Sequence, residues 1–160
     1  MKHVIKHRYT DAVLFEGDVP EDMESGLRTR AVLEQAVSAR ANLAGAYLAG
    51  ANLAGANLAG AYLDGAYLDG AYLDGAKWTD KITITQRPIQ LYGLQWPVTV
   101  LDQHMQIGCQ LHPLHDWEQF DDKTIVEMDG RDALRFWRAH KEALLGLARG
   151  AGRSFAKVEA

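Results

Sequence analysis

Four side chains that can bind a metal ion fall within a short stretch of the chain: His104, Cys109, His112 and His115. Zinc prefers thiolate and imidazole ligands, so Cys109, His112 and His115 are candidates for a zinc site. Their spacing matches no standard zinc finger, and alternation along a strand would put His104 and Cys109 on opposite faces. Cys109 equally suits the role of a small buried hydrophobic residue. We therefore expect no metal and no other cofactor, and keep these three residues as the alternative.

Residues typical of catalytic sites are sparse. The three serines, Ser25, Ser38 and Ser154, lie outside any nucleophile elbow. The repeated glycines do not form a phosphate-binding loop between a strand and a helix. Asp116 lies close in sequence to His112, but no reacting geometry is specified. The sequence therefore predicts a protein that is not an enzyme.

Tyrosine and aspartate recur together in the middle of the chain, where a five-residue motif is repeated. Tyrosine is a favoured contact residue because it buries a large area with little loss of entropy. In the alternative, the tyrosines only stack along the surface and the aspartates keep it hydrated. The predicted binding surface comprises Tyr62, Tyr67, Tyr72, Asp64, Asp69 and Asp74.

A second candidate surface is basic. From residue 131 onward the chain carries seven Lys and Arg against three Asp and Glu, although its net charge is −4. The simplest interpretation is a solvated helix face, and the alternative is a face that binds an anion or a partner. Arg131, Arg135 and Arg138 are the candidate residues. They support a second functional hypothesis, a module that sequesters an anionic small molecule or nucleotide on a basic dimer face.

The repeat itself must position the tyrosines and aspartates. Residues 41–80 read ANLAG AYLAG ANLAG ANLAG AYLDG AYLDG AYLDG AKWTD. A helix turns about 100° per residue, so a period of five would spread the leucines around all sides. A single flat strand would send successive leucines to opposite faces. The period therefore predicts a solenoid, in which each unit forms one short side and a turn at Gly.

These A(N/Y)LxG units resemble the pentapeptide repeat family. The resemblance implies a right-handed quadrilateral parallel β-helix with four units per coil, here of about two coils. We expect a mainly β solenoid with α-helical caps at both ends. The resemblance also implies that small residues from Ala41 to Ala76, at five-residue steps, point inward. The large inward side chains would be Leu43, Leu48, Leu53, Leu58, Leu63, Leu68 and Leu73.

The implied register stacks residues twenty positions apart, in the pairs Asn42–Tyr62, Tyr47–Tyr67, Asn52–Tyr72 and Asn57–Lys77. Some family members are long acidic rods that mimic DNA and bind gyrase. DNA carries one charge per about 1.7 Å of its axis over many base pairs. Two coils are too short to reproduce that field. A short DNA mimic acting on gyrase is therefore only a third hypothesis.

The flanking segments predict four regions: an N-terminal strand and capping helix (1–40), the repeat (41–80), a β-rich extension (81–112) and a helical C-terminal cap (113–160). In the first region we expect a strand at 12–16 and a helix from Ser25 or Gly26 to Ser38, with Ser25 as its N-cap. Further strands are expected at 82–85, 88–94, 96–101 and 104–111. Helices should begin near Leu114 and span 131–149, where an apolar stripe caps the fold or forms a homodimer.

Residues 86–112 and the tryptophan-bearing helices after them resemble the region that follows short pentapeptide arrays in phage and prophage proteins. The sequence has no apolar run long enough for a membrane span, and we expect no signal-peptide core at its start. A single cysteine cannot form an internal disulfide, which agrees with a reducing bacterial cytoplasm. The first functional hypothesis is thus a non-enzymatic phage or prophage protein in the host cytoplasm. It would bind a host protein, with inhibition of a defence or replication protein as one outcome. Nucleic acid and membrane are not expected partners.

Overall fold

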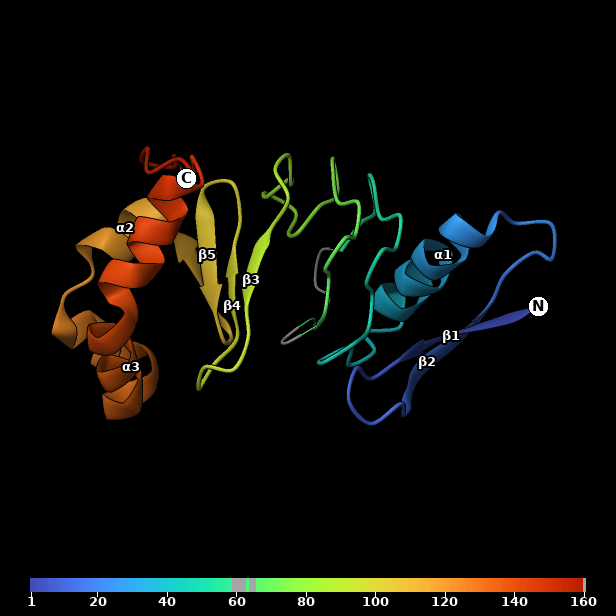
Figure 1. The fold of residues 1–160 in the computed structure, drawn as a ribbon, viewed down its shortest axis with the longest axis horizontal. Coiled ribbons are helices and arrows are strands. Elements are labelled where there is room, and N and C mark those ends of the chain that lie inside the picture. Colours follow the sequence, from blue (N-terminus) through green and yellow to red (C-terminus); the bar gives the residue numbers. More distant parts are fainter. Residues whose placement is uncertain (59–62, 64–65, 160) are drawn as a thin grey trace. The chain divides into compact units, whose positions relative to one another are not determined.

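The computed structural model describes residues 1–58, 63 and 66–159, and the chain divides into two compact units (Figure 1). The N-terminal unit comprises Met1–Gln90 and the C-terminal unit Leu91–Ala160. Within the described residues, none of the helices combines the length and the apolar character that crossing a membrane requires. Each unit has its own core.

The N-terminal unit begins with an antiparallel pair of strands, β1 (Lys2–Lys6) and β2 (Val13–Asp18), against which helix α1 (Ser25–Ser38) packs. Val32 and Leu33 of α1 are fully buried together with Ile5 of β1. The predicted helix is confirmed. The single strand expected at 12–16 is one member of a pair, and Ser25 does not cap the helix, because the N-cap position is Glu24 and no side chain caps it.

The repeat is a succession of hydrogen-bonded β-turns. In one unit the Ala51 amide donates to the Leu48 carbonyl at 3.2 Å, and Gly50 between them has φ +68°. A positive φ at the third residue of such a turn is the mark of type II and favours glycine. The described glycines that end the units all lie between +68° and +72°. The predicted inward leucines, from Leu43 to Leu73, are all buried.

The expected fold class, a mainly β parallel helix, is wrong. The regular strands form antiparallel sheets of two and four strands, and helices are a large part of the structure. Within the described part of the repeat no regular strand occurs. The physical reason is the turn: it takes four of every five residues, so a single residue per unit is left to pair and no continuous strand forms.

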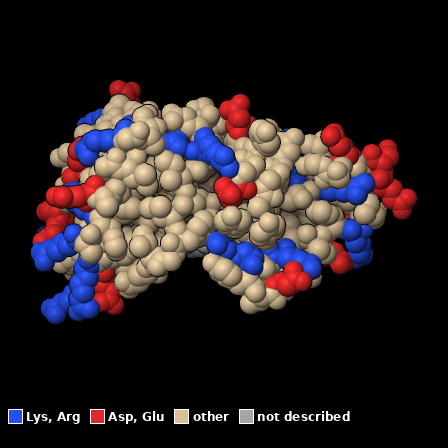
Figure 2. All heavy atoms as spheres, viewed as in Figure 1, with Lys and Arg blue, Asp and Glu red and all other residues tan. Residues whose placement is uncertain are grey.

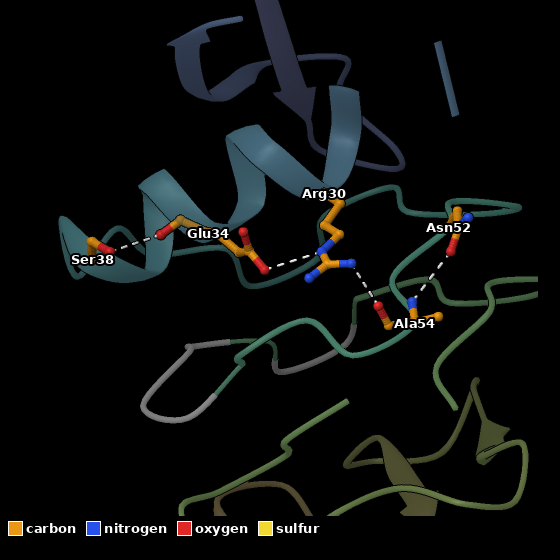
Figure 3. Close-up of polar contacts among 5 residues, drawn as sticks. All are labelled: Arg30, Glu34, Ser38, Asn52 and Ala54. Atoms are coloured by element: carbon orange, nitrogen blue, oxygen red, sulfur yellow. Dashed lines mark hydrogen bonds and ion pairs between the residues drawn. The ribbon is translucent and has the colours of Figure 1, made fainter. Parts of the chain in front are cut away.

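Those single residues nonetheless pair as the register predicts. Isolated parallel bridges join residues twenty apart, at Tyr47–Tyr67, Asn52–Tyr72 and Asn57–Lys77. The fourth expected pair involves Tyr62, which lies outside the described residues. Helix α1 is tied to the same turns by Arg30, whose Nη1 donates to the Ala54 carbonyl at 2.7 Å while Nε meets the Glu34 carboxylate at 3.1 Å (Figure 3).

The four-stranded sheet has the order β3-β4-β5-β6. Its strands are β3 (Ile89–Leu91), which spans the division between the units, β4 (Val98–Val100), β5 (His104–Ile107) and β6 (Gln110–Pro113). The strand expected at 104–111 is instead a hairpin, because Gly108 (φ +55°) and Cys109 form a two-residue turn. The strand expected at 82–85 is reduced to one bridge, between Lys77 and Thr83.

Helix α2 (Leu114–Gln119) packs against the hairpin strands of the C-terminal unit, and helix α3 (Asp122–Gly150) contacts α2 through Trp137 and Trp117 (Figure 1). The helix start expected near Leu114 is confirmed. The backbone of α3 leaves helical geometry at Asp129 and Gly130, so its longer part begins where the sequence predicts. Trp117 lies at the centre of the core: its Nε1 donates to the Met105 carbonyl at 2.7 Å, and its ring contacts Phe120 and Trp137.

Candidate binding surface

A connected cluster of aromatic and charged side chains lies on the N-terminal unit. The rings of Tyr47 and Tyr67, on successive layers of the repeat, have centroids 5.7 Å apart. The Arg8 guanidinium lies 4.8 Å from the Tyr67 ring centroid and 4.5 Å from that of Tyr9, in the loop after β1. Arginine over tyrosine faces is a cation–π arrangement. This loop therefore extends the aromatic surface of the repeat.

The cluster continues to Asp69 at the corner of the Tyr67 unit. Its carboxylate accepts a hydrogen bond from the Tyr67 hydroxyl at 3.4 Å and pairs with Arg87 at 3.2 Å. We call this set the tyrosine patch; it comprises Arg8, Tyr9, Tyr47, Tyr67, Asp69 and Arg87. Two of its rings are largely open to solvent, with Tyr9 76% and Tyr47 55% exposed. The patch thus presents aromatic area together with both signs of charge.

The remaining repeat residues of the predicted surface are distributed differently. Tyr72 is 70% exposed and Asp74 is also exposed, and both lie outside the set that defines the tyrosine patch. Tyr62 and Asp64 lie outside the described residues. The structure therefore brings together Tyr67 and Asp69 of the predicted set, and it joins them to Tyr47.

The predicted basic surface belongs to the other unit. Arg131, Arg135 and Arg138 are exposed on α3, yet Arg135 pairs with Asp132 at 3.1 Å and Arg138 pairs with Asp122. The Arg138 guanidinium lowers the pKa of the Asp122 carboxyl by its hydrogen bond. Figure 2 shows red and blue atoms alternating over the part that Figure 1 labels α2 and α3. These pairs leave less positive charge for an anionic ligand than the sequence suggests.

The candidate metal ligands do not converge in the part of the chain that the structure describes. Cys109 is exposed at the hairpin turn, so its alternative role as a buried hydrophobic residue is wrong. His112 hydrogen-bonds Gln110 and packs edge-on against Trp117 and Phe120. Burial lowers the pKa of His112, opposed by the nearby Asp116 carboxylate. His112 is therefore a half-buried histidine that packs against the aromatic core.

Sequence reasoning missed Arg8 and Tyr9. The contact of Arg8 with Tyr67 joins residues almost sixty positions apart, and no local sequence pattern predicts such a pair. The available signal is the adjacency of an arginine and a tyrosine in a polar loop, next to an expected strand. That signal indicates a surface contact only once the loop is known to reach the repeat, where the Arg8 amide donates to the Gly45 carbonyl at 2.9 Å.

The geometry agrees with a comparison against protein families, in which residues 40–77 match the family model described as pentapeptide repeats (8 copies). Residues 40–77 are pentapeptide repeats. Neither the curated proteins nor the solved structures yield a match to the chain. Pentapeptide repeats are typical of structural and interaction modules rather than of catalytic ones, so the match indicates a protein-interaction module at these residues.

Proposed function

We propose that this protein is a non-enzymatic binding protein that contacts a partner protein through the tyrosine patch. The observation that carries the proposal is the exposure of Tyr9 and Tyr47 around the Arg8 and Tyr67 stack. Tyrosine and arginine are the residues that most often dominate binding energy at protein interfaces. The patch holds both, at fixed distances, on a framework of hydrogen-bonded turns. Little ordering is then needed when a partner binds.

The partner class we propose is a protein of the bacterial host, with inhibition of a defence or replication protein as the outcome. The support is contextual: residues 86–112 resemble the segment that follows short pentapeptide arrays in phage and prophage proteins. A gyrase-directed DNA mimic receives less support, because the Asp69 carboxylate is already paired with Arg87.

Capture from a bacterial lysate by the full chain tests the proposal. Wild type should retain a specific protein, and the purified partner should bind Tyr47→Ala and Tyr9→Ala at least tenfold more weakly, as expected for contact residues at the centre of an interface. Lys77→Ala is the matched control, because Lys77 is exposed on another side of the repeat. Capture of the same protein with equal affinity by all four chains would contradict the proposal.

A further inference from the structure

A small cavity lies in the C-terminal unit, beside the junction of α2 and α3. Its volume is about 300 Å³, at the lower end of the range of roughly 300–1,000 Å³ that is usual for ligand pockets. Phe120 and Asp122 line it from the junction, and residues of α3 within 137–142 line it from the helix. All of them belong to one compact unit, so the cavity is a feature of that unit alone.

The indole of Trp137 lines this cavity and carries an unpaired hydrogen-bond donor. Trp137 is 3% exposed, and its Nε1 is buried without a hydrogen-bond partner in the part of the chain that the structure describes. The neighbouring Trp117 differs, since its Nε1 donates to the Met105 carbonyl at 2.7 Å. A buried donor without a partner is destabilising, and its burial also keeps bulk solvent from pairing with it. An acceptor held inside the cavity would relieve that penalty.

A positive charge lies beside the same ring. The Lys141 ammonium is 5.7 Å from the centroid of the Trp137 ring, and it donates a hydrogen bond to the Glu118 carbonyl at 3.1 Å. An ammonium group has three donors, so two remain without a partner among the described residues. The indole N–H and the ammonium together favour an anionic oxygen, and a carboxylate has enough acceptor sites for both.

The other charged side chains of the cavity favour a ligand that also carries a positive group. Arg138 and Asp122 are paired with each other, with the Arg138 Nε 3.5 Å from the Asp122 carboxylate. Glu142 is exposed and has no ion-pair or hydrogen-bond partner among the described residues. Consecutive residues of a helix do not face each other, so Lys141 and Glu142 present their opposite charges separately. The cavity therefore offers one positive and one negative charge to a ligand.

We infer that this cavity binds a free α-amino acid with an apolar side chain. The ligand carboxylate would accept hydrogen bonds from the Trp137 indole and the Lys141 ammonium, and the ligand ammonium would face the Glu142 carboxylate. A small movement of the long Lys141 side chain would admit the carboxylate to the buried N–H. The rings of Phe120 and Trp137 would contact the apolar side chain. Such a ligand complements both charges and covers aromatic surface. The inference does not depend on the tyrosine patch, which belongs to the N-terminal unit.

Titration of the full chain with free leucine tests this inference. The matched probes are isocaproate, which has the carboxylate without the ammonium group, and isoamylamine, which has the ammonium group without the carboxylate. The measurement is the position of the Trp137 indole N–H resonance in a proton–nitrogen NMR correlation spectrum, assigned by its loss in Trp137→Phe. Leucine should move this resonance downfield to a plateau, because the N–H gains an acceptor. Leucine should also bind at least tenfold more tightly than either probe, because each probe lacks one charge-assisted contact.

Two charge substitutions test the assigned contacts. Lys141→Gln keeps a donor for the Glu118 carbonyl but removes the positive charge, and it should bind leucine at least tenfold more weakly. Glu142→Gln should abolish the preference for leucine over isocaproate. Arg135→Gln is the control, because it breaks an exposed ion pair of α3 outside the cavity, and it should bind leucine as wild type does. The inference is overturned by an indole resonance that leucine does not move, by equal binding of leucine and isocaproate to wild type, or by unchanged leucine binding in Lys141→Gln.

Discussion

The two units use aromatic side chains in opposite ways. In the N-terminal unit, Tyr47 and Tyr72 are 55% and 70% exposed. In the C-terminal unit, Trp117 and Trp137 are each 3% exposed. The space available inside each unit explains the difference. The turns of the repeat enclose an interior filled by Leu and Ala, whereas helices packed against a sheet leave room for large rings. Aromatic area is therefore exposed to solvent in one unit and part of the core in the other.

Replacing a buried ring should give the largest effect. Trp117→Ala removes a ring that contacts His112, Phe120 and Trp137, together with its bond to Met105. We expect a loss of about 3–5 kcal/mol in the free energy of unfolding of the C-terminal unit. Urea unfolding followed by near-ultraviolet circular dichroism measures it. Tyr72→Ala is the control from the other unit and should change stability by less than about 0.5 kcal/mol; similar losses for both variants would refute the contrast.

A smaller effect is expected where α1 meets the repeat. Arg30→Ala removes the bond to the Ala54 carbonyl and the pair with Glu34 (Figure 3). Because the guanidinium is partly exposed, we expect about 1.5 kcal/mol of destabilisation. Hydrogen exchange of the repeat amides is the measurement. Glu34→Gln breaks only the ion pair and should cost about 0.3–0.5 kcal/mol. If the two variants exchange alike, the bond to Ala54 does not stabilise the repeat.

The same substitution should have opposite signs in the two units. Gly55 has φ +69° with open space around it, so Gly55→Ala is expected to destabilise by about 1 kcal/mol through backbone strain alone. Gly146, within α3, also has open space and no positive φ. Gly146→Ala should stabilise by about 1 kcal/mol. Thermal unfolding of both variants tests the pair, and a shared sign would mean that local backbone geometry does not decide the outcome.

Acidification should weaken the C-terminal unit by way of its histidines. Burial lowers the pKa of His104 and of His112. A histidine whose pKa is lower in the folded state prefers to be neutral there. The stability that each histidine contributes to the folded unit is fully present above its ordinary, unfolded-state pKa of about 6.5. This stability is lost as the pH falls from there towards the lower pKa of the folded state.

The measurement is the melting temperature between pH 7.5 and 5.5 for wild type and for the His104→Gln, His112→Gln double variant. Wild type should lose more stability than the double variant over this interval, because only wild type must protonate the half-buried imidazoles of His104 and His112. Equal slopes would show that other groups control the pH dependence.

Much of the local structure follows from short-range patterns. The leucine period predicts which side chains are buried, and the apolar spacing of α1 predicts its bounds. Gly130 marks the start of the longer part of α3. Each of these depends on residues within one or two turns of each other, where glycine geometry and helical spacing act directly.

What the sequence did not reveal depends on distant contacts. β1 is short and polar, and its strand form depends on pairing with β2 and with Tyr47. The hairpin at Gly108 was available as a two-residue turn signal, but the apolar run around it favours one continuous strand. The predicted fold class was wrong because a period of five does not show how many residues of each unit belong to the turn, and therefore how many remain to form a strand. The tyrosine patch could not be predicted because the fold, and not the local sequence, places Arg8 next to Tyr67.

The hydrogen-bonded turn has a consequence for how surface chemistry can change. Each turn is closed by Leu and Ala backbone groups and shaped by Gly, as at Leu48, Gly50 and Ala51. The second residue of each unit lies outside that closing bond and is exposed at both Tyr47 and Asn52, although the Asn52 Oδ1 also accepts a hydrogen bond from the Ala54 amide. Such positions act as independent display sites on a common frame. Substitutions at the second residue of single units could therefore change the surface chemistry while the buried Leu and Ala side chains stay the same.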